Sequence, residues 1–316
     1  MLKARVSHEG GGYLVRTNQL GFRSEREFTI GRNGSTRRIL LFGNSFTAGD
    51  GVSNGRRYSD RLEELIPDLE VYNFGLPGSG TDQQYLAYQQ YAQGIEHDLL
   101  VIAVLVENIR RVVARYRYAI SDGGDIRCSP KPYFTLEAGR LELRNVPVPR
   151  GLVREDDLPE DERSAVDRGG RFPLVRALAR RTGVRELAQR VTRYQPLPEY
   201  GDPRGGAWLL LRAILKEWIS RHSRPVLLMP LPVPQYVEAT SDPAPYQARF
   251  RELAADAGCQ LHDPLPDLVR HPRSARRRFR FAQDIHPTPE GHAALAASLA
   301  PAIERLLPDV RFQIPP

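Results

Sequence analysis

The 316-residue chain contains little cysteine, little lysine and no long apolar segment. Its two cysteines, Cys128 and Cys259, are not in CxxC or CxxH spacing, so the sequence indicates neither a disulfide framework nor a zinc site. The longest apolar runs, such as residues 99–106, are too short to cross a bilayer, and residues 1–16 lack the apolar core of a signal peptide. We therefore expect a cytoplasmic protein that does not bind membranes.

Lysine occurs only at Lys3, Lys131 and Lys216, so arginine supplies almost all of the positive charge. The net charge of +7 fits either a solvated basic surface or the attraction of an anionic substrate. The basic runs carry no RNP, zinc-finger or helix-turn-helix signature, so nucleic acid is not an expected partner. These runs span residues 108–118, 175–190 and 271–281.

Short apolar runs alternate with helical patterns along the chain. Between the runs, apolar residues recur at helical spacing, for example at Tyr58, Leu62, Leu65 and Ile66. This alternation predicts an α/β fold with a doubly wound, mainly parallel five-stranded sheet. The expected strands lie within residues 37–43, 69–75, 97–106, 224–232 and 258–263.

Three residues mark expected helix ends. Thr81 is a candidate N-cap for a helix that carries Tyr85 and Tyr88, and Thr288 is a candidate N-cap for the last helix. Gly258 stands where a helix C-terminus favours glycine.

Within a single domain, residues 37–118 and 205–308 are expected to form the core. Residues 1–36 are predicted to form a small β extension, and residues 119–204 an insertion of helical and irregular structure. The insertion contains a predicted hairpin over residues 133–148 and a charged segment, residues 154–171, that is expected to be mobile. It is long enough to serve as a lid, although many loops of this length have no such role.

Polar residues follow several of the predicted strands. Ser45 comes directly after the first strand, a glycine-rich loop at residues 75–80 follows the second, and Asn108 follows the third. Asp284 and His286 lie just before the terminal helix. Because ligands bind beyond the carboxyl ends of the strands in an open α/β sheet, these residues are expected to converge.

The converging residues are those of an acyl-transfer site. His286 can act as the base that activates the hydroxyl of Ser45, and Asp284 can orient the imidazole. The backbone N–H groups of Ser45 and Gly78 and the side-chain amide of Asn108 can form an oxyanion hole. Each residue also has a structural interpretation: Ser45 as a turn residue, His286 as a helix-entry residue and Asn108 as a helix cap.

Four segments resemble conserved blocks of the SGNH (GDSL-like) hydrolase family, in the family's order. The resemblance implies a flavodoxin-like three-layer α/β/α fold, no metal or organic cofactor, and the roles given above for Ser45, Gly78, Asn108 and His286. Two departures stand out: Asn44 replaces the family's usual aspartate, and a single residue separates Asp284 from His286. The four segments are "GNSFTAGDGV", "NFGLPGSGTDQ", "ENI" and "DIHPTPEGH".

These observations predict a serine esterase that cleaves a short-chain or acetyl O-acyl ester of a carbohydrate or natural product. An acyltransferase using the same residues is an alternative, and a catalytically silent carbohydrate-binding module is a second one. Oligomeric state is not indicated by any pattern. The candidates for substrate contact, with an anionic substrate in mind, are Asn44, Arg110, Arg111 and Arg115.

Overall fold

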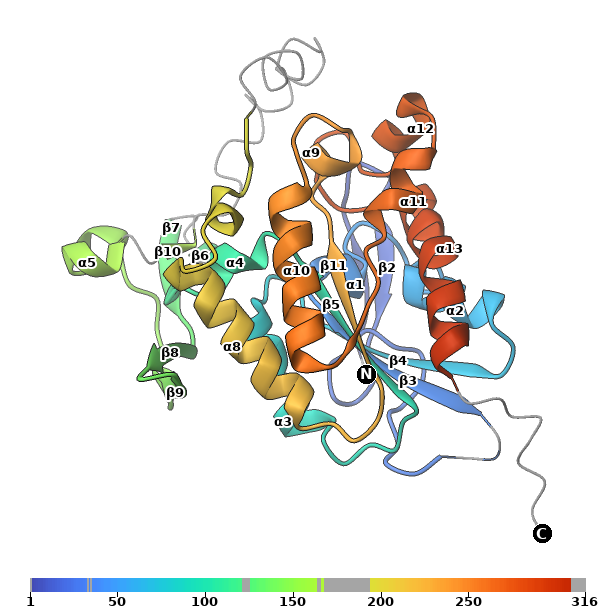
Figure 1. Cartoon of the computed structure of the whole chain (residues 1–316), viewed down its shortest axis with the longest axis horizontal. Helices are drawn as coiled ribbons and strands as arrows, with labels where there is room; N and C mark the ends of the chain where they lie inside the picture. Colours follow the sequence, from blue (N-terminus) through green and yellow to red (C-terminus); the bar gives the residue numbers. More distant parts are fainter. Residues whose placement is uncertain are drawn as a thin grey trace.

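The computed structural model describes residues 2–32, 34, 36–120, 126–163, 166–167 and 194–307. At its centre lies a five-stranded sheet with strand order β12-β11-β5-β3-β4, and all the paired strands run parallel (Figure 1). The strands are β3 (Arg37–Gly43), β4 (Leu69–Gly75), β5 (Leu99–Leu105), β11 (Val226–Leu231) and β12 (Gln260–Leu261).

The strand order confirms the predicted doubly wound sheet, and it is the flavodoxin-like order. Every residue of β5 is buried, because this central strand is covered by helices on both faces. The edge strand β12 is shorter than predicted, with only two residues paired to β11. The order reverses between β3 and β5, which places a binding crevice at the carboxyl ends of these two strands.

Helices cover both faces of the sheet, as Figure 1 shows. Helices α3, α8 and α10 pack together on one face, whereas α2 and α13 pack together on the other. Leu65 was expected on the buried face of α2, but it is 52% exposed at the end of the helix. The bounds are α2 (Tyr58–Leu65), α3 (Thr81–Tyr91), α8 (Gly206–Ser220), α10 (Ala244–Ala257) and α13 (Pro289–Leu306).

Two of the three predicted helix ends are confirmed. The Thr288 side chain caps α13 by accepting a hydrogen bond from the Gly291 N–H at 3.2 Å, and Gly258 ends α10 with φ of 66°. The prediction for Thr81 was wrong, because Gly80 is the N-cap of α3 and Thr81 is its first residue. The Thr81 hydroxyl instead accepts a hydrogen bond from the side-chain amide of Asn108, just after β5.

Short helices occupy several of the connections. Two of them, α1 and α4, directly follow β3 and β5 at the carboxyl edge of the sheet. The short helices are α1 (Ser45–Ala48), α4 (Asn108–Arg111), α9 (Pro234–Val237), α11 (Leu265–Arg270) and α12 (Arg273–Arg278).

The N-terminal extension is a β hairpin followed by a loop that packs on the core. Strands β1 (Lys3–Val6) and β2 (Tyr13–Arg16) pair antiparallel, as the predicted β extension requires. Beyond the hairpin, the buried Arg23 guanidinium donates hydrogen bonds to the carbonyl oxygens of Gly49 (2.6 Å) and Val52 (2.7 Å). The extension therefore holds the loop that leaves α1.

The insertion forms two small sheets beside the core. The predicted hairpin is confirmed as β8 (Tyr133–Glu137) and β9 (Arg140–Arg144). The second sheet contains β6 (Tyr116–Ile120), β7 (Ile126–Pro130) and β10 (Val166–Asp167). The charged segment expected to be mobile contains the short helices η1 (Glu155–Asp157) and α5 (Glu160–Arg163), while residues 168–171 and the basic run 175–190 lie outside the described residues.

A buried ion pair joins the insertion to the core. Lys131, between β7 and β8, contacts the carboxylate of Asp82 in the first turn of α3, and both side chains are at most 5% exposed. At the other end of the insertion, Tyr200 in η2 (Pro198–Gly201) packs into the core and donates its hydroxyl to the Val106 carbonyl at 2.8 Å. Both ends of the insertion are thus fixed near the carboxyl edge of the sheet.

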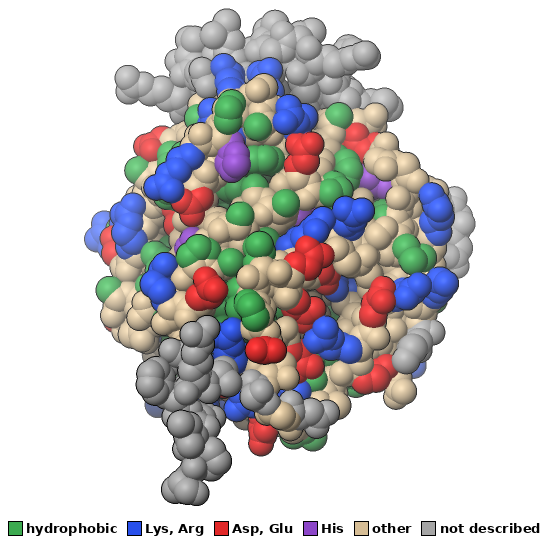
Figure 2. All heavy atoms as spheres, turned by 90° about the vertical axis from the view of Figure 1, so that its right-hand side faces the viewer, with side chains coloured by type: hydrophobic (Ala, Val, Ile, Leu, Met, Phe, Trp, Pro, Cys, Tyr) green, Lys and Arg blue, Asp and Glu red, His purple; other side chains and the backbone are tan. Residues whose placement is uncertain are grey.

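Basic and acidic side chains are interspersed on the face of the molecule that carries α2 and α13 (Figure 2). Ion pairs of this surface include Arg61 with Glu64 and Arg278 with Glu290. In the part of the chain that the structure describes, no helix has the length and apolar character needed to cross a membrane.

Candidate active site

The loop that leaves β3 turns directly into α1, which begins at Ser45. Asn44 caps this helix, because its side-chain oxygen accepts a hydrogen bond from the Phe46 N–H at 3.0 Å. The end of β4 packs against the same turn, since a Cβ atom added at Gly75 would lie 2.3 Å from the backbone nitrogen of Ala48. Ser45 is therefore held at the carboxyl edge of the sheet with its side chain near the surface, 6% exposed.

A chain of hydrogen bonds joins three of the predicted residues. The Ser45 hydroxyl lies 2.8 Å from Nε2 of His286, and Nδ1 of His286 lies 2.7 Å from Oδ1 of Asp284. The neutral imidazole then donates its Nδ1–H to the carboxylate and accepts the serine proton at Nε2. This is the geometry that a general base needs to activate a hydroxyl nucleophile.

Two carboxylates lie near His286, and their environments push the pKa values in opposite directions. Burial alone would raise the pKa of Asp284, but hydrogen bonds from His286 and His8 outweigh it and lower this pKa. Burial raises the pKa of Asp50, an effect that the nearby His286 and Arg23 partly oppose. Of these two carboxylates, Asp284 is therefore the one whose ionised form is favoured by its contacts with the imidazole.

The three predicted oxyanion-hole residues lie on neighbouring elements of the carboxyl edge. Gly78 has φ of 72° in the loop between β4 and α3, and Ser45 and Asn108 begin α1 and α4. Asn108 does not cap α4, because Glu107 is the N-cap and Asn108 is the first residue of the helix. Its side-chain amide donates to the Thr81 hydroxyl at 3.2 Å. This bond orients the fully buried amide and uses one of its two N–H groups.

The three arginines predicted to contact substrate are engaged with groups of this chain. Arg110 pairs with Glu199 and donates to the Pro196 carbonyl, and Arg115 lies 3.6 Å from Glu162. Arg111 donates to the carbonyl of Ser79, in the loop that carries Gly78, at 3.4 Å. An anion-binding role for these three residues stays a prediction.

The predicted contact of Asn44 with substrate is at odds with its burial. The side chain is 0% exposed beneath the turn that carries Ser45, and its oxygen is used in capping α1. An asparagine here keeps the acceptor that the cap needs, so Asn44 contributes to the shape of the turn that carries Ser45.

Several residues at the site carry no recognisable signal in the sequence. Arg117 of β6 lies against the loop that carries Gly78, since a Cβ atom added at Gly78 would come within 2.0 Å of Nη1 of Arg117. His8 lies 3.2 Å from Oδ2 of Asp284, and both oxygens of Glu9 accept from the Gln283 N–H at 2.9 and 3.0 Å. No motif or spacing in the sequence links Arg117, His8 or Glu9 to the four segments that resemble blocks of the family.

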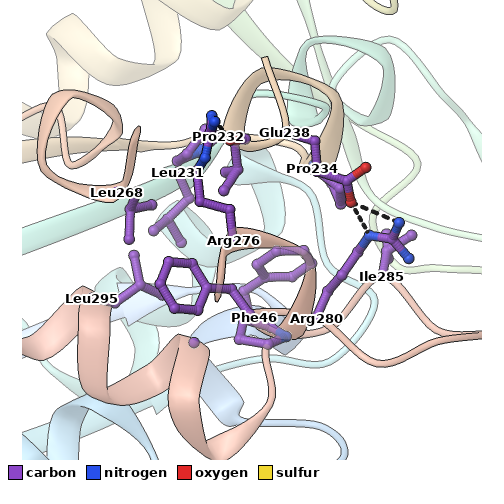
Figure 3. Close-up of a pocket in the computed structure, with 14 residues that line it drawn as sticks. Phe46, Leu231, Pro232, Pro234, Glu238, Leu268, Arg276, Arg280, Ile285 and Leu295 are labelled. Carbon is purple, nitrogen blue, oxygen red and sulfur yellow. Dashed lines mark hydrogen bonds and ion pairs between the residues drawn. The ribbon is translucent and has the colours of Figure 1, made fainter. Parts of the chain in front are cut away.

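An apolar pocket lies next to the site, between the loop that carries His286 and the ends of β11, α11 and α13 (Figure 3). It contains about 470 Å³ of space not filled by atoms, part of it open to solvent. Phe46, the neighbour of Ser45, and Ile285, between Asp284 and His286, both line it. The ion pair between Arg280 and Glu238 forms one polar wall.

Within the described ranges, no three or more His, Cys, Asp or Glu side chains are grouped so that they could hold a metal ion.

A three-layer α/β/α fold with a Ser–His–Asp hydrogen-bond chain at its carboxyl edge has the architecture of a serine hydrolase. Solved structures similar to the chain include a member of the lipolytic protein G-D-S-L family from Veillonella parvula DSM 2008, at 14% identity, covering 86% of this chain and 100% of that one, with a TM-score of 0.45. The lipase/acylhydrolase from Enterococcus faecalis matches at 14% identity, with 86% and 98% coverage and a TM-score of 0.46. The acetyl xylan esterase AlAXEase matches at 14% identity, with 84% and 99% coverage and a TM-score of 0.45.

No family model and no curated protein matches the chain. Because the identities and TM-scores of these structures are low, the function proposed below rests on the geometry of the site.

Proposed function

We propose that the protein is a serine hydrolase that cleaves O-acyl esters through an acyl-enzyme on Ser45. The observation that carries the proposal is the continuous hydrogen-bond chain from Ser45 through His286 to Asp284, with bonds of 2.8 and 2.7 Å. In this geometry one imidazole can serve as base in the first half of each step and as acid in the second.

In the first step the Ser45 oxygen attacks the ester carbonyl carbon as its proton moves to Nε2 of His286. The tetrahedral oxyanion is stabilised by the backbone N–H groups of Ser45 and Gly78 and by the second N–H of the Asn108 amide. The C–O bond to the alcohol then breaks, and the leaving oxygen takes the proton from Nε2. The products are the free alcohol and an ester of Ser45.

In the second step a water molecule gives a proton to Nε2 of His286 and attacks the acyl carbonyl. The second tetrahedral intermediate collapses, the bond to Ser45 breaks, and the proton returns to the serine oxygen. The carboxylic acid leaves. The nucleophile, the base and the oxyanion donors all come from this chain, so the proposed reaction needs no metal or organic cofactor.

We propose a short acyl group, acetyl in the simplest case, on a carbohydrate or natural-product alcohol. The apolar pocket lined by Phe46 and Ile285 supports an apolar group close to the nucleophile turn. Arg111 and Arg117 lie near the loop that carries Gly78, and their positive charges favour an alcohol that carries negative charge.

The test is labelling with a fluorophosphonate, which reacts with activated serines, in the native chain and in Ser45→Ala. Labelling of the native chain that is lost in Ser45→Ala is expected. Absence of Ser45-dependent labelling in a folded native chain would overturn the proposal and leave a silent binding module. Aryl esters of increasing acyl length, assayed with and without a sugar acceptor, then define the acyl group. Formation of an acylated sugar at the expense of hydrolysis would reassign the protein as an acyltransferase.

A further inference from the structure

The N-terminal hairpin contributes two side chains to the residues around Asp284. The turn between β1 and β2 brings His8 and Glu9 onto the loop that precedes α13, although 276 residues separate His8 from Asp284. The His8 ring packs edge-on against Phe281 in this loop, with ring centroids 4.3 Å apart. The loop that leaves α1 completes the contact, because a Cβ atom added at Gly51 would lie 3.2 Å from the His8 ring.

The hydrogen bonds of His8 fix its tautomer. The Gly10 N–H points to Nδ1 of His8 at 3.2 Å, so Nδ1 acts as the acceptor and the proton of the neutral ring resides on Nε2. Nε2 lies 3.2 Å from Oδ2 of Asp284. Asp284 therefore receives one imidazole N–H on each oxygen, from His286 on Oδ1 and from His8 on Oδ2.

Glu9 holds the backbone of the same residue. Its carboxylate accepts the Asp284 N–H at 2.7 Å, in addition to the Gln283 N–H. A carboxylate bound to backbone N–H groups is among the stronger hydrogen-bond arrangements in proteins. The main chain and the side chain of Asp284 are thus each held by a residue of the hairpin.

We propose that His8 and Glu9 are positioning residues of the active site, which hold Asp284 in the orientation that His286 requires. The inference rests on the function proposed above. Asp284 is 32% exposed, so water competes for its oxygens and could let the carboxylate rotate away from the imidazole. His8 holds Oδ2, and the ring and backbone N–H of His286 hold Oδ1, so the carboxylate is fixed in the position that orients the imidazole toward Ser45.

Other charged groups face the two histidines and are considered in the test. Asp50 interacts electrostatically with His286, Asp284 and His8, and Arg23 lies close to Asp50. Tyr13 of β2 packs against His8 with ring centroids 5.8 Å apart. The test variants leave all of these groups in place.

The variants separate hydrogen bonding from packing. His8→Phe keeps a ring against Phe281 and Tyr13 but removes the donor, whereas His8→Gln retains an N–H that can reach Asp284. Glu9→Ala removes the acceptor for the loop. The matched control is Glu27→Ala, because Glu27 also accepts a backbone N–H with both oxygens, at Gln19 in the same extension but outside the site.

We expect His8→Phe and Glu9→Ala each to lower kcat for a neutral aryl acetate by roughly tenfold with little change in KM, because a hydrogen bond to a charged group is lost. We expect His8→Gln to recover most of the rate and Glu27→Ala to equal the native enzyme. Melting temperatures of all variants identify any that are unfolded. A kcat within twofold of native in folded His8→Phe and Glu9→Ala, with an unchanged pH–rate profile, would overturn the inference.

A spectroscopic readout keeps this test apart from the test of hydrolysis. The Nδ1–H proton of His286, identified in ¹H NMR by its loss in His286→Ala, should give a low-field signal that shifts in His8→Phe. A shift in a chain that shows no Ser45-dependent labelling would support the positioning role and refute only the hydrolase. Labelling of Ser45 together with an unmoved signal would refute the positioning role and leave the hydrolase standing.

Discussion

The guanidinium of Arg117 lies against Gly78, because a Cβ atom added there would come within 2.0 Å of its Nη1. Neither charge runs nor motif spacing singles it out, since it follows a cluster of other arginines at Arg110, Arg111 and Arg115. Its position on β6, just before the insertion, brings a cation to the carboxyl edge of the sheet.

We predict that Arg117→Gln raises KM for an anionic ester by about tenfold and spares a neutral aryl ester, because it removes a positive charge that would attract the anionic group. Steady-state kinetics with the two substrates measure the effect. Arg140→Gln, on the exposed end of the β8–β9 hairpin, is the matched control. Equal losses with both substrates would show that Arg117 supports the loop and does not bind the anion.

The sequence allowed the hydrogen-bonded residues Ser45, Asp284 and His286 to be predicted as a set of candidates, but not the residues that hold them. Ser45 and His286 stand in segments whose order and spacing are informative by themselves. His8 and Glu9 belong to a polar turn that resembles any other, and only the fold brings this turn to Asp284. Thr81 was taken for a helix cap because its position fits that role, yet its hydroxyl is used by Asn108.

At the scale of elements, the packing of β4 on α1 sets the position of Ser45. A Cβ atom at Gly75 would come within 2.7 Å of both Cα of Ala48 and the carbonyl carbon of Thr47, all of them backbone atoms that cannot rotate aside. The close approach of strand and helix therefore requires glycine at this position.

We predict that Gly75→Ala displaces α1, destabilises the protein by about 1–3 kcal/mol and lowers kcat more than KM. Urea unfolding and aryl-ester kinetics measure the two effects. Gly94→Ala serves as the control, since a Cβ atom there meets nothing within 4 Å. Native kcat in Gly75→Ala would mean that the nucleophile turn tolerates the displacement.

A second contact between elements is the Lys131–Asp82 pair, which attaches the insertion to α3. Both groups are buried, so removing one leaves an uncompensated charge in the interior. We predict that Lys131→Met costs about 3–5 kcal/mol in the free energy of unfolding. Lys216→Met, which breaks an exposed pair with Asp256, should cost less than about 1 kcal/mol in the same urea titration. Equal costs would show that the buried pair contributes no more than a surface one.

The strands and long helices could be predicted because burial on both faces gives continuous apolar runs and helical periodicity. The short β12 was overestimated, since an edge strand pairs on one side only and its apolar run does not fix its length. Apart from the β8–β9 hairpin, the sequence of the insertion has no periodic pattern that predicts its separate small sheet.

At the scale of the whole molecule, His292 links stability to pH. It is fully buried in α13 and its Nδ1 accepts the Tyr58 N–H at 3.1 Å, which joins α13 to α2. Burial lowers the pKa of His292 from 6.5 to about 3. Since the folded pKa is depressed, the unfolded chain binds a proton below pH 6.5 that the folded protein rejects, and stability falls as the pH drops from 6.5 toward 3.

We predict that this residue accounts for a loss of roughly 2 kcal/mol in the free energy of unfolding between pH 6.5 and pH 4.5. His292→Asn keeps an acceptor for the Tyr58 N–H but does not titrate, so its stability should depend less on pH. Urea titrations at both pH values measure the difference, with the exposed His271→Asn as control. Parallel losses in the native protein and His292→Asn would contradict the assignment.

The proposed site joins residues that are synthesised far apart in time, because they are far apart in the sequence. Ser45 and His286 are 241 residues apart, and the supporting turn at His8 is synthesised before either. A growing chain therefore carries Ser45 long before His286 is synthesised, so the hydrogen bond between them can form only after most of the chain has been made. During refolding, recovery of esterase activity would report the formation of the contact between Ser45 and His286. This contact has a high sequence separation and is expected to form late, so the activity would not report the formation of the central sheet alone.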